Sequence, residues 1–176
     1  MPEGITESMR IYPMIMHAVL GILPLFVLLE CLNPLNLNNT TMNKQFFISL
    51  LFALITFVIL GTVFGSLVYL PETAGWYEAY PEAVRETPDI VSGLVVGLIQ
   101  LIALIILLPK LQITTVSGGA IFGAIYSVVL WLMIDLQMVS VTNIVSYDYV
   151  LKDALLSAVM GAVLGLVITW SQKRFA

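Results

Sequence analysis

The sequence predicts an all-α integral membrane protein, built as a bundle of five transmembrane helices. Of its 176 residues, 60% are hydrophobic and 10% are charged, whereas a soluble domain carries about 25% charged residues. The mean hydropathy is +1.01. Ten-residue segments of alternating polarity, typical of a membrane β-barrel, are absent. Five stretches reach the roughly 20 apolar residues that a spanning helix needs, and they lie at residues 11–32, 45–70, 90–109, 116–139 and 150–171.

The first span contains the single histidine and the single cysteine of the chain. The preceding segment MPEGITESMR holds two acidic residues and one arginine, unlike the basic start of a signal peptide, so the span is expected to be retained. His17, Gly21 and Pro24 share one helix face. Because Pro24 frees the carbonyl of Leu20, which neighbouring helices must shield, this face is expected to point inward.

The longest connection, Pro71–Asp89, lies between the second and third spans. It carries three aromatic residues, Trp76, Tyr77 and Tyr80, and rings with a polar tip favour the headgroup zone of a membrane. A short interfacial helix is expected in this loop. Its aromatic residues either anchor the loop at the interface or form a docking surface for a partner.

The distribution of charges predicts the orientation of the spans. Basic residues in short loops favour the cytoplasmic side. Five spans put four basic residues on the side of the C-terminus and three on the other side, where most of the acidic residues also lie. We therefore expect the N-terminus outside and the C-terminus in the cytoplasm, with the protein in the plasma membrane. The basic residues on the C-terminal side are Lys44, Lys110, Lys173 and Arg174.

Glycines four residues apart occur in every span from the second to the fifth. Residues at this spacing share a helix face, and the missing side chains let a neighbouring backbone approach closely. The repeated pattern predicts tight packing of helices, with further small faces open to other subunits. The pairs are Gly61–Gly65, Gly93–Gly97, Gly119–Gly123 and Gly161–Gly165.

Two ionisable residues, His17 and Asp135, are expected well inside the bilayer. At a rise of about 1.5 Å per residue, both lie roughly 7–9 Å below the outer surface. Because an unpaired polar group at this depth is costly, we predict that His17 and Asp135 form a pair. At 100° per residue, Asp135 lies about 160° round its helix from Gly119, so the two residues can face different neighbours. Gln100, near the midplane, is the other deep polar residue.

No cofactor is predicted, although structural lipids are expected around the spans. A bis-histidine haem is excluded within a chain that has one imidazole. A copper(I) site is chemically allowed, because thioether and imidazole groups suit that ion. The residues that could contribute to a metal site are Met14, His17, Met133 and Asp135.

The leading functional prediction is a non-catalytic accessory subunit of a larger membrane protein complex. Motifs for nucleotide binding, serine hydrolysis and zinc proteolysis are absent, so catalysis by this chain is not expected. The small-residue faces and short loops favour a protein that binds lipids and other membrane subunits. The net charge of −4 gives no indication of nucleic-acid binding. The alternative is a small transporter or channel for a proton or metal ion, using His17, Gln100 and Asp135.

Overall fold

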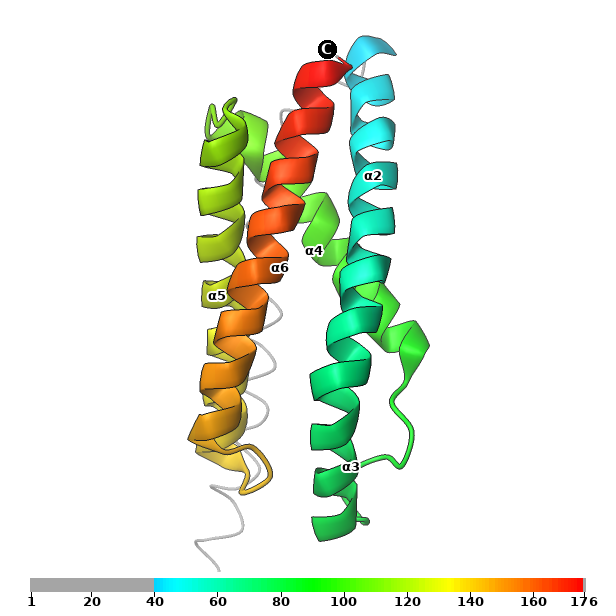
Figure 1. Cartoon of the computed structure of the whole chain (residues 1–176), viewed down its shortest axis with the longest axis vertical. Coiled ribbons are helices and arrows are strands. Elements are labelled where there is room, and N and C mark those ends of the chain that lie inside the picture. The colour runs from blue at the N-terminus through cyan, green and yellow to red at the C-terminus, as the bar shows by residue number, and fades with distance from the viewer. Residues whose placement is uncertain (1–39, 176) are drawn as a thin grey trace, which may run out of the picture. The chain divides into compact units, whose positions relative to one another are not determined.

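The computed structural model describes residues 40–175, and this part of the chain consists of helices and short connections (Figure 1). It contains four helical segments that are long and apolar enough to cross a membrane. The first expected span, with His17 and Met14, lies outside the described residues. The elements are α2 (Thr40–Phe64), the π-helix η1 (Gly65–Tyr69), α3 (Leu70–Ala79), α4 (Ile90–Lys110), α5 (Val116–Val141) and α6 (Tyr147–Arg174).

The short helix expected between the second and third spans is α3, but it continues directly from the span. Together, α2, η1 and α3 form one long helix, so the expected loop shrinks to residues 80–89. Proline removes a backbone N–H, and its ring meets the carbonyl four residues back. The π-helix ends two residues before Pro71, and its wider turn is closed by the Leu70 N–H donating to the Gly65 carbonyl. This local widening lets the helix pass the proline.

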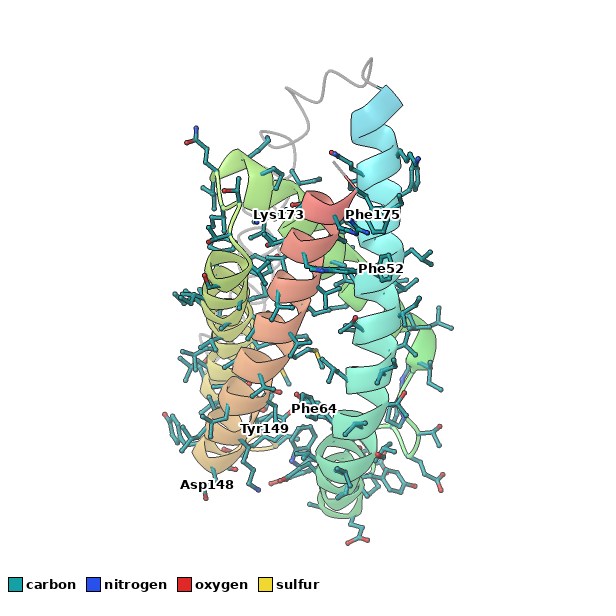
Figure 2. The ribbon with its side chains drawn as sticks, turned by 45° about the horizontal axis from the view of Figure 1, so that its top comes forward. Phe52, Phe64, Asp148, Tyr149, Lys173 and Phe175 are labelled. Atoms are coloured by element: carbon teal, nitrogen blue, oxygen red, sulfur yellow. The ribbon has the colours of Figure 1, made fainter. Side chains whose placement is uncertain are left out.

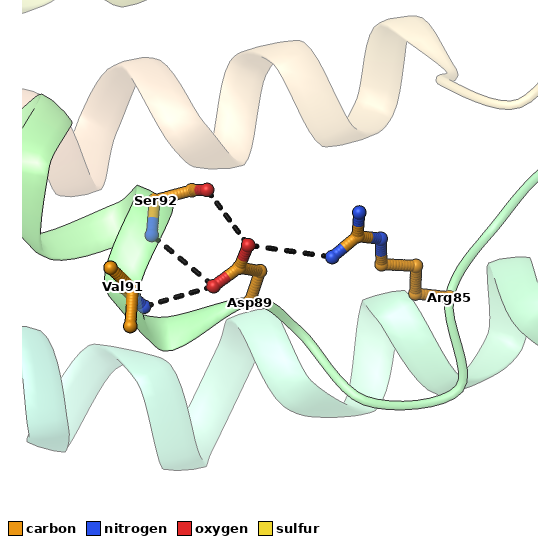
Figure 3. Close-up of polar contacts among 4 residues, drawn as sticks. All are labelled: Arg85, Asp89, Val91 and Ser92. Carbon is orange, nitrogen blue, oxygen red and sulfur yellow. Dashed lines mark hydrogen bonds and ion pairs between the residues drawn. The ribbon is translucent and has the colours of Figure 1, made fainter.

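The other three helices begin and end within a few residues of the expected bounds, and a side chain caps each start. The Asp89 carboxylate accepts from the backbone N–H groups of Val91 at 3.0 Å and Ser92 at 3.3 Å (Figure 3). It also accepts from the Ser92 hydroxyl at 2.8 Å, and Arg85 approaches it at 3.4 Å. The hydrogen bonds from Ser92 hold the pKa of Asp89 below its usual range. The caps of α5 and α6 are Thr115 and Ser146.

Helix α6 is central to the described bundle. It runs antiparallel beside α5, and it also contacts α2 and α4 (Figure 1). The start of α2 and the end of α6 lie at one end of the bundle, whereas α3 and the turn between α5 and α6 lie at the other. The connections of the described spans therefore alternate between the two ends. The buried apolar core where the helices meet comprises Ala53, Leu101, Leu104, Ile105, Leu108, Leu164 and Ile168.

Aromatic packing joins α2 to α6 at the C-terminal end of the bundle (Figure 2). The ring of Phe52 lies edge-on to Trp170, with centroids 5.6 Å apart, and stacks on Phe175 at 6.0 Å. In the same two helices, the hydroxyl of Ser171 donates to that of Ser49 at 2.8 Å, and both serines are fully buried.

Two of the predicted glycine pairs lie against each other between α5 and α6. A Cβ atom built on Gly119 would stand 2.6 Å from the carbonyl oxygen of Gly165, well inside normal contact distance. Cβ atoms built on Gly123 and Gly161 would each overlap the carbonyl oxygen of the other residue. The two backbones therefore approach as closely as residues without side chains allow.

The other two glycine pairs have different surroundings. The ring of Phe57 covers Gly97, where an added Cβ would overlap it. At Gly61, Gly65 and Gly93, no atom of the described residues comes within 4 Å of an added Cβ. Within residues 40–175, these three glycines therefore lie on open helix faces.

Candidate functional site

Two carboxyl groups meet between α5 and α6, at the end of the bundle that also holds α3. Asp135 lies six residues before the end of α5 at Val141, and Asp153 lies six residues after the start of α6 at Tyr147. Because the helices are antiparallel, both aspartates lie about 9 Å from this end. Their residues are 7% and 3% exposed, and the two carboxyl groups lie within hydrogen-bonding reach of each other.

Asp153 is surrounded by hydroxyl donors. The Tyr69 hydroxyl, at the end of η1, donates to its Oδ1 at 2.5 Å. The Ser157 hydroxyl, one turn further along α6, donates to Oδ2 at 3.4 Å. Tyr149 lies near enough to interact electrostatically with both aspartates. Both oxygens of Asp153 are therefore engaged by neutral groups.

The carboxyl group of Asp135 has fewer hydrogen-bond partners than that of Asp153. Its Oδ2 is buried, and no group among the described residues forms a hydrogen bond with it. Leaving a buried polar atom without a partner costs about 1–3 kcal/mol, and more when the group is charged. This oxygen is therefore the atom of the cluster that most needs a further ligand.

Side chains of α3 and α6 contact one another at this end of the bundle. The Trp76 ring lies edge-on to Tyr149, with centroids 4.7 Å apart. Figure 2 shows Tyr149 at the end of α6 near α3, with Asp148 beside it at the tip of the bundle. Lys152 forms an ion pair with Glu72 at 2.7 Å. A groove of about 470 Å³ lies next to this ion pair, and it is lined by Leu67, Val68, Pro71, Glu72 and Lys152.

Two of the three aromatic residues predicted as a partner surface, Trp76 and Tyr80, make contacts within the molecule itself. Trp76 packs against Tyr149, and the Tyr80 hydroxyl donates to the carbonyl of Asn143 at 3.2 Å, in the connection between α5 and α6. Tyr77 is half-buried. Two of the three predicted contact residues therefore help to fasten α3 to the α5–α6 hairpin.

The other predicted polar residues do not join the carboxyl cluster. Gln100 is 5% exposed and donates to the Ser127 hydroxyl at 3.2 Å. Ser127 lies eight residues, or about 12 Å, along α5 from Asp135, so Gln100 is separated from the carboxyl pair. Met133 is 51% exposed. Within the described part of the chain, no three His, Cys, Asp or Glu side chains are grouped to hold a metal ion. His17 and Met14 lie outside that part.

Asp153 is the member of the site that the sequence analysis did not single out. Its position near the start of a span suggested a carboxylate at the water boundary. A stronger signal was the spacing of α6, where Asp153, Ser157, Gly161 and Gly165 follow one another in four-residue steps. Such a row shares one face, so the glycines that pack against α5 also bring the aspartate to that helix.

Comparison of the chain with protein-family models, with curated proteins and with solved structures finds no match.

Proposed function

We propose that this protein is a small membrane transporter or channel for protons or cations, and that Asp135 and Asp153 form its binding site. The observation that supports this function best is the meeting of two carboxyl groups, both more than nine-tenths buried, between spanning helices. Ionisable groups inside a membrane are costly, and they commonly mark the path of an ion or proton. Tyr69 is the third member of the site, in place of the Gln100 expected from the sequence.

The proposed pairing of His17 with Asp135 belongs to the same hypothesis. Asp135 Oδ2 offers an acceptor without a partner among residues 40–175. An imidazole N–H is a suitable donor for such an oxygen. In this proposal, His17 connects the carboxyl pair to the first span.

Transport by purified protein in lipid vesicles tests the proposal. Proton flux and cation flux are followed separately, with dyes that respond to pH or to the cation. We expect flux above that of empty vesicles, and we expect Asp135→Asn and Asp153→Asn to abolish it. Asp148→Asn is the matched control, because Asp148 lies exposed in the first turn of α6. Flux equal to that of empty vesicles, or full flux in both site variants, would contradict the proposal.

A second candidate function is a non-catalytic accessory subunit of a membrane complex. The observation in its favour is the open small faces at Gly61, Gly65 and Gly93. Small residues on a membrane helix allow close approach of another helix, including one from a neighbouring subunit. Purification of the native protein in mild detergent is expected to recover defined partners, and Gly61→Ile should release them. A single species in the native preparation would argue against this role.

We also propose that the protein lies in the plasma membrane and that the C-terminal end of the bundle faces the cytoplasm. The support is the excess of basic residues at that end, from Lys44 in α2 to Lys173 and Arg174 in α6.

A further inference from the structure

We propose that the species bound at Asp135 and Asp153 is a single proton shared by the two carboxyl groups, and not a metal cation. This inference rests on the proposed function and names its substrate. It follows from three features of the site: the oxygens already engaged, the charges around them, and the number of ligands that a cation requires.

The first feature is the state of the four carboxyl oxygens. The two oxygens of Asp153 accept from Tyr69 and Ser157. The two carboxyl groups also lie within hydrogen-bonding reach of each other. Ionised carboxylates only accept hydrogen bonds, so a hydrogen bond between two carboxyl groups requires a proton on one of them. The contact between Asp135 and Asp153 is therefore one that a shared proton stabilises.

The second feature is the lack of compensating positive charge beside the pair among residues 40–175. Two carboxylates side by side repel each other, and burial opposes ionisation of either one. Within residues 40–175, the titratable groups facing the pair are Tyr69 from η1 and Tyr149 from α6, and both are neutral phenols. Lys152 is the nearest basic residue along α6, and it is engaged by Glu72. A proton removes one of the two negative charges without requiring any new protein ligand.

The third feature is the small number of open oxygens. Mg²⁺ and Ca²⁺ take six or more oxygen ligands, and a cation that loses its hydration shell needs several oxygens in its place. Asp135 Oδ2 is the one side-chain oxygen of the cluster that is buried without a hydrogen-bond partner among the described residues. This atom can accept a single donor, but it cannot build a coordination shell with the groups described here.

Infrared spectroscopy of the full-length protein in lipid tests this inference. The chain has four aspartates, and labelling their carboxyl carbons with ¹³C identifies their bands; Asp89 and Asp148 lie exposed at helix starts. At neutral pH, we expect the C=O stretch of a protonated aspartate in the wild type, shifted in D₂O. The band should remain in Asp148→Asn. It should be lost in Asp135→Asn, where Asp153 keeps its hydroxyl donors and meets an amide.

The wild-type protein alone decides between a proton and a cation. Titration with Na⁺, K⁺, Mg²⁺ or Ca²⁺ is expected to leave the band unchanged. A band that disappears as one cation is added would overturn the shared proton while leaving cation transport intact. A wild-type spectrum without a protonated aspartate would also overturn it. If the band is present but vesicles show no flux, the shared proton stands and the proposed transport function fails.

Discussion

Tyr69 is the residue whose contribution to the carboxyl cluster can be isolated most cleanly. Replacing Tyr69 with Phe keeps the ring and removes the hydroxyl that donates to Asp153 Oδ1. A buried acceptor left without its donor costs about 1–3 kcal/mol, so the free energy of unfolding should fall by that amount. Equilibrium unfolding in detergent measures this change. Tyr147→Phe is the control, because Tyr147 is exposed at the start of α6; equal stability of the two variants would show that the Tyr69 hydroxyl contributes nothing.

The carboxyl site was only half predictable from the sequence. Asp135 interrupts a long apolar run, so its charge stands out, and the structure buries it between the described helices. Asp153 follows the polar residues at the start of α6, where a carboxylate usually extends into water. Tyr69 is separated from Asp153 by 84 positions. Only the packing of η1 and α5 on α6 brings these groups together, and no local pattern encodes that packing.

His17 and Asp135 provide a second prediction at the scale of single residues. If they are paired, His17→Ala and Asp135→Asn each remove the same interaction, so their effects on unfolding should not add. We expect a coupling energy of about 0.5–3 kcal/mol from the double-mutant cycle. Asp135→Asn should be the milder single change, because an amide still forms hydrogen bonds. Strictly additive effects would exclude the pair and make His17 a residue of some other contact.

At the scale of elements, the contact between α5 and α6 follows rows of residues four apart. On a straight helical wheel, Asp135 lies about 160° from Gly119. Both residues are nevertheless buried on the described bundle. A row in four-residue steps winds slowly round its helix, and a neighbouring helix that crosses at an angle follows the row. The helical wheel treats the helix as straight, so it places Gly119 and Asp135 on different faces. Because α6 crosses α5 at an angle, both residues lie at one interface.

The π-helix is the other feature of an element that the sequence did not reveal. The second span was expected to end at residue 70, next to Pro71, and an α-helix cannot keep its regular hydrogen bonds through proline. The helix widens over Gly65–Tyr69 and continues as α3. This continuation carries Glu72 and Trp76 to the start of α6, where they contact Lys152 and Tyr149. The break that the sequence suggested is thus a local adjustment, and the helix beyond it contacts the start of α6.

The glycine contact between α5 and α6 gives a prediction that separates the two kinds of glycine face. Gly161→Ile places a branched side chain against the backbone of Gly123, so the helices must move apart. We expect a loss of about 1–3 kcal/mol in the free energy of unfolding, the usual cost of overpacking, together with lower folded yield. Gly93→Ile is the matched control, since no described atom lies within 4 Å of its added Cβ. Similar stability of the two variants would mean that α5 and α6 tolerate separation.

At the scale of the whole molecule, the two ends of the described bundle differ in charge. Lys44, Lys110, Lys173 and Arg174 belong to the end that holds the C-terminus. The opposite end holds Glu72 and Glu78 of α3, and Asp148 of α6. Basic residues are retained on the cytoplasmic side of a membrane, whereas acidic residues contribute little to orientation. The basic residues therefore support the prediction that the C-terminus is cytoplasmic. On that prediction, the groove beside Glu72 and Lys152 faces the outside.

Thiol labelling of intact cells tests this orientation with one reporter at each end. Both reporters are made in a Cys31→Ser background, so that the introduced thiol is the only one in the chain. Ala79→Cys, at the end of α3, should react with an impermeant reagent added outside. Thr114→Cys, in the connection between α4 and α5, should react only after the membrane is permeabilised, because the two connections lie at opposite ends of the bundle. The reverse pattern would invert the orientation, and it would turn the carboxyl site toward the cytoplasm. Labelling of both reporters from outside would contradict the alternation of the spans themselves.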